Sequence, residues 1–315
     1  MFEQYTYLAL YFSRTVYYNE IVGRRIQKLD RQSLLLGRKN TMNKTWLITG
    51  CSEGGIGAGI ARAVLAHGDN AVITARSLSK LESIARDYPD TCLPLTVDMA
   101  DKGQIRNAVD RGVERFGTVD VLVNNAGHGY RSSVEEGEEE AVQELFRTNV
   151  FGPVDMIKAV LPVLRAKGSG VIMNTTSIAT ERSAVGSGYY AASKAALDLL
   201  TDGLCKELKP LGIRVMVIEP GSFRTHFYDE ALKSAPLTVD AYKDSTWKNA
   251  NAVNRRQQPG DPMKAGELVY RMAYAEEAPF RLLLGSDAVQ VVLSTAEARI
   301  EETKRFAEDS RSTDY

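Results

Sequence analysis

The sequence contains few of the residues that hold metals or form disulfides. Its three cysteines, Cys51, Cys92 and Cys205, lie far apart, and its three histidines are equally scattered. Neither set has the paired spacing of a zinc site, so we expect no metal centre. An odd number of scattered cysteines also excludes a disulfide framework. It is typical of a reducing compartment, which predicts a cytoplasmic protein.

The chain also lacks a strong charge imbalance and a long apolar run. It has 39 basic and 40 acidic residues among 315, with a formal net charge of -1. This balance gives no reason to expect nucleic acid as a partner. No apolar run approaches the roughly 18 residues that a membrane-spanning helix needs. With 44% hydrophobic residues, the composition is that of a globular protein.

The first 43 residues differ from the rest of the chain. They carry seven Lys or Arg against three acids, and they are rich in tyrosine. An aromatic, basic helix could contact a membrane surface or a partner subunit. The favoured interpretation is a poorly ordered extension, or an upstream start ahead of a second start at Met42. We therefore expect one domain, over residues 44–315.

From Thr45 onward, short apolar runs alternate with longer helix-like segments. Strands are expected at residues 45–49, 71–74, 93–97, 119–123, 171–174 and 214–218. Uniformly apolar short strands separated by helices indicate a parallel sheet that is covered on both faces. The pattern predicts an α/β, doubly wound Rossmann fold, with ligands at the carboxyl ends of the strands.

Residues 222–263 interrupt this regular pattern. They are polar, yet they include Phe223, Phe227, Tyr228, Tyr242 and Trp247. A long segment of this kind after a strand predicts a substrate loop, with a plain surface excursion as the alternative. A helix near residues 264–275, an apolar run at 282–284 and a charged last helix are expected to complete the domain.

A glycine-rich turn follows the first expected strand and precedes a helix-like run at residues 58–66. Glycines in this place let the backbone approach a pyrophosphate, and the helix N-terminus meets its charge. The residues expected to contact a dinucleotide here are Gly50, Ser52, Glu53, Gly54, Gly55 and Ile56.

The residues after the second strand bear on the choice of cofactor. An NAD-specific site places an acid there, whereas this chain has Ala75 and Arg76. A guanidinium suits a 2'-phosphate, so NADP(H) is predicted and NAD(H) is the alternative. Glu53 favours NAD if its side chain points into the pocket. Asp98 is expected to accept from the adenine amine, or else to cap the following helix.

Tyr190 and Lys194 are four residues apart in a helix-like segment, so they share one face. A cation beside a phenol favours the phenolate and lowers its pKa, which makes the phenol a proton donor and acceptor. Tyr189 has no such lysine, because Ser193 lies four residues after it. The spacing alone also fits an ordinary helix face, so the interpretation depends on the remaining motifs.

Several motifs occur in one order and together resemble the short-chain dehydrogenase/reductase family over residues 44–285. They are the glycine turn, Asp98, Asn124-Asn125-Ala126-Gly127, Asn149, Ser177, Tyr190 with Lys194, and Pro220-Gly221 with Thr225. The chain ending and the long loop resemble the branch of 17β-hydroxysteroid dehydrogenases. The glycine turn departs from the usual pattern by one extra residue, with Gly54 and Gly55 adjacent.

The resemblance implies hydride transfer between NADP(H) and a ketone, an aldehyde or a secondary alcohol. Tyr190 would transfer the proton, and Lys194 would lower the Tyr190 pKa and hold the nicotinamide ribose. Ser177 would hydrogen-bond the carbonyl oxygen. Asn149 would belong to a proton relay behind Lys194. The further cofactor contacts implied are Met99, Asn125, Ala126, Gly127, Pro220, Gly221, Phe223 and Thr225.

Three functions remain open at this point: a carbonyl reductase, a lipid- or steroid-linked ketone reductase at a membrane surface, and a non-catalytic NADPH-sensing regulator. The loop composition, together with His128, predicts a pocket for an apolar substrate body. Residues 138–165 and 187–210 are expected to pair in a homodimer or homotetramer, as is common in the family.

Overall fold

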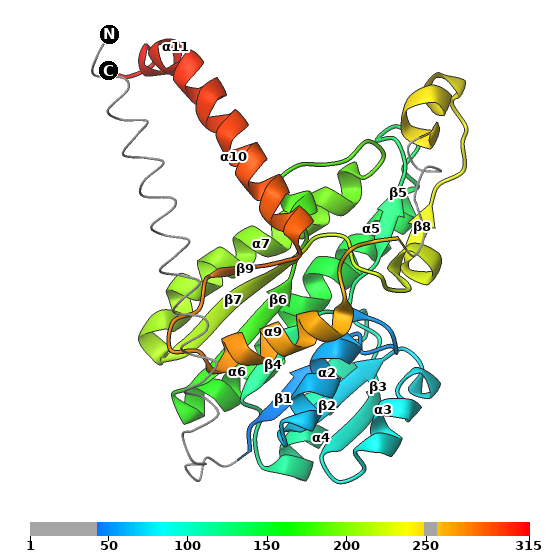
Figure 1. The fold of residues 1–315 in the computed structure, drawn as a ribbon, viewed down its shortest axis with the longest axis vertical. Helices are drawn as coiled ribbons and strands as arrows, with labels where there is room; N and C mark the ends of the chain where they lie inside the picture. Colours follow the sequence, from blue (N-terminus) through cyan, green and yellow to red (C-terminus); the bar gives the residue numbers. More distant parts are fainter. Residues whose placement is uncertain (1–42, 249–256) are drawn as a thin grey trace. The chain divides into compact units, whose positions relative to one another are not determined.

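The computed structural model describes residues 43–248 and 257–315. This part of the chain contains a seven-stranded parallel sheet in the order β3-β2-β1-β4-β6-β7-β9 (Figure 1). The strands are β1 (Thr45–Ile48), β2 (Asn70–Ala75), β3 (Cys92–Thr96), β4 (Val121–Asn124), β6 (Gly170–Thr175), β7 (Ile213–Pro220) and β9 (Arg281–Leu284). The predicted doubly wound Rossmann fold is confirmed.

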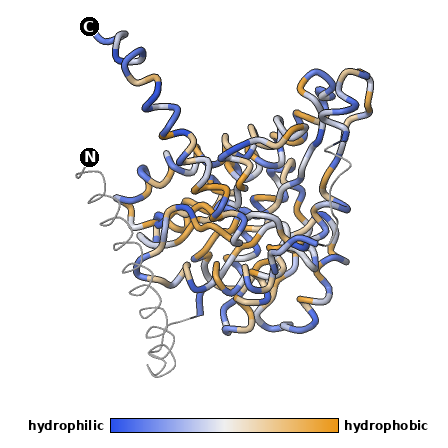
Figure 2. The backbone as a smooth tube through the Cα atoms, turned by 45° about the horizontal axis from the view of Figure 1, so that its top comes forward, coloured by the Kyte–Doolittle hydropathy of each residue, from blue (hydrophilic) through white to orange (hydrophobic). Residues whose placement is uncertain are grey.

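The strands are apolar on both faces because each face packs in its own core. Trp46 and Ile48 belong to one buried cluster, and Leu47 between them belongs to the other. Side chains alternate across a strand, so a strand covered on both sides is apolar along most of its length. Figure 2 shows the hydrophobic segments gathered in the interior of the domain.

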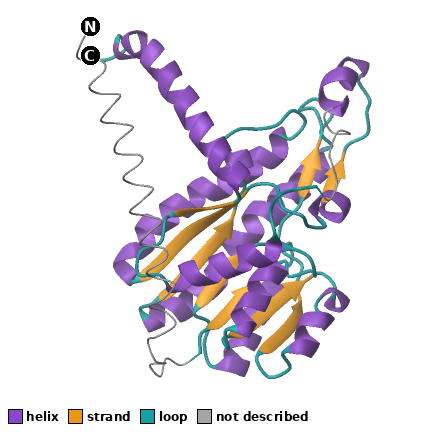
Figure 3. Ribbon diagram, in the orientation of Figure 1, coloured by secondary structure: helices purple, strands orange, loops and turns teal. Residues whose placement is uncertain are grey.

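Helices cover both faces of the sheet (Figure 3). On one face lie α2 (Ile56–Ala66), α3 (Glu82–Asp87) and α9 (Pro262–Tyr274); on the other lie α4 (Lys102–Phe116), α6 (Gly152–Lys167) and α7 (Gly188–Leu208). Helices α2 and α9 cross at Gly59 and Gly266, where a Cβ on either residue would overlap the backbone of the other helix. This contact explains why glycine stands in the middle of both helices.

The remaining elements connect these layers. They are η1 (Leu78–Lys80), α5 (Glu139–Phe146), η2 (Arg147–Phe151), η3 (Ile178–Thr180) and η4 (Lys209–Leu211). After β9, α10 (Ser286–Arg305) and α11 (Ala307–Arg311) form the expected charged end of the domain. Within the described ranges, no helix combines the length and the apolar character that crossing a membrane requires.

The expected substrate loop contains a strand that the sequence did not predict. β8 (Leu232–Ser234) pairs in parallel with β5 (Gly129–Arg131), and it lies among the short helices η5 (Phe227–Ala231), η6 (Asp240–Tyr242) and η7 (Lys243–Trp247). A three-residue strand with the sequence Leu-Lys-Ser has too little apolar pattern to be recognised. Residues 249–256 of this loop, and the expected extension up to residue 42, lie outside the described residues.

Candidate active site

Lys194 lies in the first half of α7 and is 4% exposed. Its Nζ donates to the backbone carbonyl of Thr175, the last residue of β6, at 2.8 Å. Burial lowers the pKa of Lys194 to about 8, because an ammonium without bulk water loses its hydration. The side chain therefore lies at the carboxyl ends of the central strands, where the fold predicts a ligand.

Tyr190 lies one turn before Lys194, and its phenol is hydrogen-bonded to Ser177. Ser177 follows β6 and begins η3, and its Oγ accepts from the Ala179 N–H at 3.2 Å. Tyr190 and Ser177 thus meet where β6 ends and α7 begins, as the motif order predicts. The two hydroxyls form a pair that could bind one carbonyl oxygen.

The pKa of Tyr190 differs from the expectation. Burial is the main cause that raises it to about 12; the hydrogen bond with Ser177 opposes this shift in part, and the nearby Tyr228 adds a smaller increase. The sequence predicted that Lys194 would lower it. That prediction is wrong for the protein groups alone, because the ammonium donates to Thr175 and burial dominates at the phenol.

Asn149 is fully buried in η2, a single turn of π-helix. Its Oδ1 accepts from His128 N at 3.0 Å, and its Nδ2 donates to His128 O at 3.0 Å and to Ser193 Oγ at 3.1 Å. A Cβ on Gly127 would lie 3.0 Å from Asn149 Oδ1 and 3.3 Å from Lys194 Nζ. Asn149 therefore joins the end of β4 to the helix that carries Lys194.

The glycine turn is braced by the segment that follows β4. Gly50 has a φ of +72° and approaches Ala126 so closely that a Cβ would lie 2.7 Å from its Cα. Asn125 Nδ2 donates to the carbonyls of Thr49 and Gly50, and Thr49 Oγ1 accepts from the N–H groups of Asn125 and Ala126. Sequence reasoning missed Thr49, whose only signal is its place at the strand end.

The N-terminus of α2 suits an anion. Its N-cap, Gly55, offers no side-chain cap, and Gly54 before it has a φ of +77°. The first N–H groups of the helix are thus left for a ligand such as a pyrophosphate. The glycine cradle therefore fits a dinucleotide, with Ser52 and Ile56 at its two ends.

Two charged groups near this cradle have different surroundings. The Glu53 carboxylate pairs with Arg62 at 3.1 Å and accepts from the Ser83 hydroxyl. Arg76 follows β2, is exposed, and forms no hydrogen bond or ion pair with any residue in the described ranges. The guanidinium of Arg76 is therefore available to an anionic ligand, whereas Glu53 is already paired.

Two residues after β3 were expected to contact a cofactor, and they have different surroundings: Asp98 lies in a polar turn, and Met99 packs in the core. Asp98 Oδ1 accepts from Ala100 N at 2.8 Å, but the N-cap of α4 is Asp101, which accepts from Gly103 N and Gln104 N. The alternative role of Asp98 as the helix cap is therefore wrong. Met99 is 4% exposed and packs in a core cluster, so only its backbone could contact a cofactor.

The segment after β7 is tied to the last strand and helix. Gly221 N donates to Leu284 O at 2.9 Å, and Ser222 N donates to Asp287 Oδ2 at 2.6 Å. These contacts fix the backbone after Pro220, where the family resemblance places the carboxamide end of a nicotinamide. Farther along, Thr225 Oγ1 accepts from the N–H of Phe227 at 3.2 Å.

The aromatic residues of the loop have three different environments. The Phe227 ring lies 5.9 Å from the Tyr190 ring, and the Tyr228 ring lies 5.5 Å from that of Phe227. Phe223 is 7% exposed and packs in the core against Gly260, so its expected place in the substrate pocket is wrong. Trp247 packs in a separate cluster with Tyr130 and contributes its indole N–H to a carboxylate.

That carboxylate is Glu136, which sequence reasoning did not single out. Its Oε1 accepts from Thr238 N at 2.8 Å and Val239 N at 3.0 Å, and its Oε2 accepts from Ser133 Oγ at 2.7 Å and Trp247 Nε1 at 3.0 Å. Burial by itself would raise the pKa of Glu136, but these hydrogen bonds lower it to about 2. Glu136 therefore holds residues 238–247 against the segment after β5.

His128 is 6% exposed, and its backbone makes two hydrogen bonds with Asn149. Neither ring nitrogen has a hydrogen-bond partner among the described residues. Burial, followed by the charge of Lys233, lowers the His128 pKa to about 4, so the ring is neutral at physiological pH. A neutral imidazole is compatible with the apolar pocket expected around it.

Comparisons with known proteins agree with this geometry. The family described as short chain dehydrogenase matches residues 44–235. Oxidoreductase BOA17 of Botryotinia fuckeliana is 33% identical over 81% of this chain and 94% of its own length. A 3-ketodihydrosphingosine reductase of Bacteroides thetaiotaomicron is 32% identical over 80% of this chain and 91% of its own length.

Solved structures give the same result. A short-chain dehydrogenase from Streptomyces avermitilis has a TM-score of 0.81 and 36% identity, over 88% of this chain and all of that one. Structures with bound NAD and with bound NADP share the fold, with TM-scores of 0.72 and 0.65 at 23% and 24% identity. These two structures hold different nicotinamide cofactors, so the shared fold does not select between NAD and NADP.

Proposed function

The chain belongs to the short-chain dehydrogenase family, and we propose on that basis that it is an NADP(H)-dependent oxidoreductase of ketones, aldehydes or secondary alcohols. The observation that carries the proposal is the hydrogen-bonded pair of Tyr190 and Ser177, one helical turn from the buried Lys194. This arrangement provides a proton donor and a carbonyl-binding hydroxyl beside a cation.

The cofactor would be held by groups that are already in place. Gly50, Gly54 and the N-terminus of α2 would contact the pyrophosphate, Arg76 would bind a 2'-phosphate, and Lys194 would contact the nicotinamide ribose. When bound, this cofactor supplies or accepts the hydride. NADP(H) is favoured over NAD(H) because Arg76 is available and Glu53 is paired with Arg62.

The protein's own groups would handle the proton. In the reductive direction, Ser177 donates a hydrogen bond to the substrate oxygen, and Tyr190 transfers its proton to that oxygen as the carbonyl carbon is reduced. A phenol with a pKa of about 12 is fully protonated beforehand, as an acid must be. Lys194 would hold the nicotinamide ribose beside the phenol, and Asn149 fixes the backbone around this site.

The substrate would have an apolar body. Phe227 lies against Tyr190, with Tyr228 beside it, so the wall nearest the proton donor is aromatic. The similarity to a 3-ketodihydrosphingosine reductase supports a second candidate within the same chemistry, a lipid- or steroid-linked ketone. Because the complete Ser177, Tyr190 and Lys194 set is present, we disfavour a regulator that only senses NADPH.

The protein would act as a homodimer or homotetramer. Leu199 and Leu200 on α7 are 69% and 50% exposed, and Phe151 at the end of η2 is 52% exposed. Apolar side chains on these helices support pairing between two copies of this face. Light scattering of the purified protein measures the number of copies.

One assay tests cofactor, reaction and substrate class together. The oxidation of NADPH and of NADH is compared against bulky ketones, aldehydes, steroids and long-chain 3-ketones, with the Tyr190→Phe protein as the control. The proposal requires reduction of at least one carbonyl class that is lost in the variant. Tight NADPH binding without turnover of any carbonyl or alcohol would favour the sensing role instead.

A further inference from the structure

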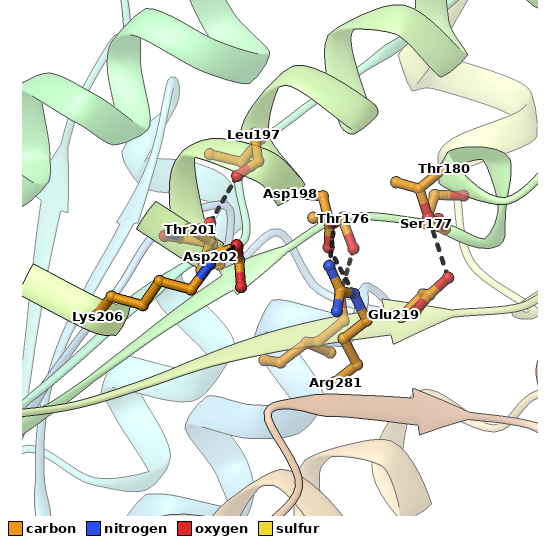
Figure 4. Close-up of polar contacts among 12 residues, drawn as sticks. Thr176, Ser177, Thr180, Leu197, Asp198, Thr201, Asp202, Lys206, Glu219 and Arg281 are labelled. Atoms are coloured by element: carbon orange, nitrogen blue, oxygen red, sulfur yellow. Dashed lines mark hydrogen bonds and ion pairs between the residues drawn. The ribbon is translucent and has the colours of Figure 1, made fainter. Parts of the chain in front are cut away.

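The hydroxyl of Thr180 lies between two oxygen atoms that accept hydrogen bonds. Thr180 Oγ1 is 2.8 Å from the Ser177 carbonyl oxygen and 3.1 Å from Glu219 Oε1 (Figure 4). A hydroxyl has one proton to donate, and an ionised carboxylate has none. If Glu219 is ionised, Thr180 can donate to only one of the two oxygens, and the other contact has no proton between its two atoms. With Glu219 protonated, its carboxyl donates to Thr180, and Thr180 donates to the Ser177 carbonyl.

The surroundings of Glu219 also disfavour a charge. The residue lies near the carboxyl end of β7 and is 1% exposed, and its Oε2 has no hydrogen-bond partner within the described part of the chain. The charged groups facing it are Glu181 after η3, Asp198 on α7 and Arg281 on β9. Arg281 is already bound to Asp198 by two hydrogen bonds, of 3.2 Å and 2.6 Å, which reduces its influence on Glu219 (Figure 4).

We propose that Glu219 is held as a neutral carboxylic acid and acts, through Thr180, as a positioning residue for Ser177. The chain of contacts runs from the Glu219 carboxyl to the Thr180 hydroxyl and on to the Ser177 carbonyl. Ser177 begins the turn η3, so this chain fixes the backbone that presents the Ser177 hydroxyl to Tyr190. A carboxylic acid kept neutral in order to donate is an established use of burial in active sites.

The proposal has a consequence at neutral pH. Burial, with smaller contributions from the charges of Glu181 and Asp198, raises the pKa of Glu219 to about 7. Above that pH the Thr180 hydroxyl turns toward the carboxylate. The Ser177 carbonyl then keeps only the hydrogen bond from Thr180 N, at 3.0 Å. The turn that carries Ser177 becomes less well fixed as Glu219 loses its proton.

The first test needs no substrate. Infrared difference spectra of the purified protein between pH 5 and pH 9 should contain the carbonyl band of a buried carboxylic acid, lost with a midpoint near 7. Glu219→Gln removes this band, because an amide does not titrate. If Glu219→Gln does not fold, Thr180→Val provides the second variant and shifts the band, since the acceptor of the acid proton is gone. The proposal is overturned if the parent shows no titrating band, or if these variants leave the band unchanged.

The second test rests on the proposed reductase function. The ratio of kcat for the parent to kcat for Glu219→Gln is measured across the same pH range. This ratio cancels the titration of Tyr190 and Lys194, which both proteins share. We expect it to be constant at low pH and to fall about five-fold through pH 7, the effect of one hydrogen bond. The cofactor Kd should show no such step.

Glu181→Gln is the matched control for this experiment. It removes one neighbouring negative charge and leaves the Glu219–Thr180–Ser177 contacts in place. The step in its kcat profile should therefore persist with a lower midpoint. If the ratio of the parent kcat to the Glu219→Gln kcat stays flat with pH, the positioning role is contradicted. If no carbonyl is reduced by any of the proteins, the proposed function fails, and the infrared band still decides whether Glu219 is neutral.

Discussion

The ammonium of Lys194 donates to the backbone carbonyl of Thr175 at 2.8 Å. This contact joins α7 to the end of β6, two residues before Ser177. Lys194 is thus held at the site by the strand that also positions the second hydroxyl of the active-site pair. The same burial that fixes Lys194 disfavours its charge, which gives the first prediction.

Lys194→Met should be more stable than the parent at neutral pH and nearly inactive. The folded pKa of Lys194, about 8, lies below the ordinary value of 10.5, so the unfolded chain binds more protons between these values. Stability of the parent therefore rises with pH across this window, and the variant lacks this rise. At pH 7 the free energy of unfolding of the variant should exceed that of the parent by about 3 kcal/mol. Urea unfolding at pH 7 and pH 10.5 measures this difference. An equal stability difference at both pH values would contradict this.

Asn149→Ala should lower the free energy of unfolding by about 3 kcal/mol, because it leaves the buried His128 N–H and C=O without partners. Ser193→Ala is the matched control. It removes the hydrogen bond from Asn149 and the one that the Ser193 hydroxyl donates to Tyr190 O, and it should cost about 1.5 kcal/mol. Urea unfolding of both proteins measures the difference. Equal losses in the two variants would contradict the bridging role of Asn149.

Glu136→Ala should release residues 238–247 and raise the KM for bulky substrates, with little effect on cofactor Kd. All four close donors to this carboxylate lose their acceptor. Since the pKa of Glu136 is about 2, the protection of this loop against proteolysis in the parent should not change between pH 4 and pH 9. Limited proteolysis of the loop measures the release. Glu135→Ala, which removes only an exposed contact with Tyr242, is the control and should leave cleavage rates near those of the parent.

Arg76→Ala should weaken NADPH binding about 10- to 100-fold and leave NADH binding within about two-fold, because a charge-assisted contact to the 2'-phosphate is lost. Arg86→Ala changes the net charge equally at an exposed position on α3 and serves as the control. Fluorescence titration gives the four dissociation constants. Equal losses for both cofactors would argue against a 2'-phosphate contact at Arg76.

The fold could be predicted because its signals are local. A strand buried on both faces is mostly apolar, and a glycine turn after the first strand is visible in the sequence itself. The order of Ser177, Tyr190 and Lys194 was equally visible. The structure brings Tyr190 and Ser177 into contact and places Lys194 beside the strand end that leads to Ser177.

What could not be predicted depends on contacts between distant segments. Glu136 finds three of its four close donors about a hundred residues away, and no spacing in the sequence indicates them. Phe223 and Phe227 occur in the same polar loop, yet one packs in the core and the other against Tyr190. The raised pKa of Tyr190 follows from its burial, which helical spacing alone does not reveal.

The central claim is that Tyr190 transfers the proton. The most direct measurement is single-turnover reduction of a carbonyl substrate by Tyr190→Phe with NADPH, alongside Tyr189→Phe. The account predicts a loss of about 10³-fold for Tyr190→Phe with NADPH still bound. It predicts a loss below about ten-fold for Tyr189→Phe, because this variant loses only the hydrogen bond that the Tyr189 hydroxyl donates to Val134 O. Reduction by Tyr190→Phe at the parent rate would contradict the account.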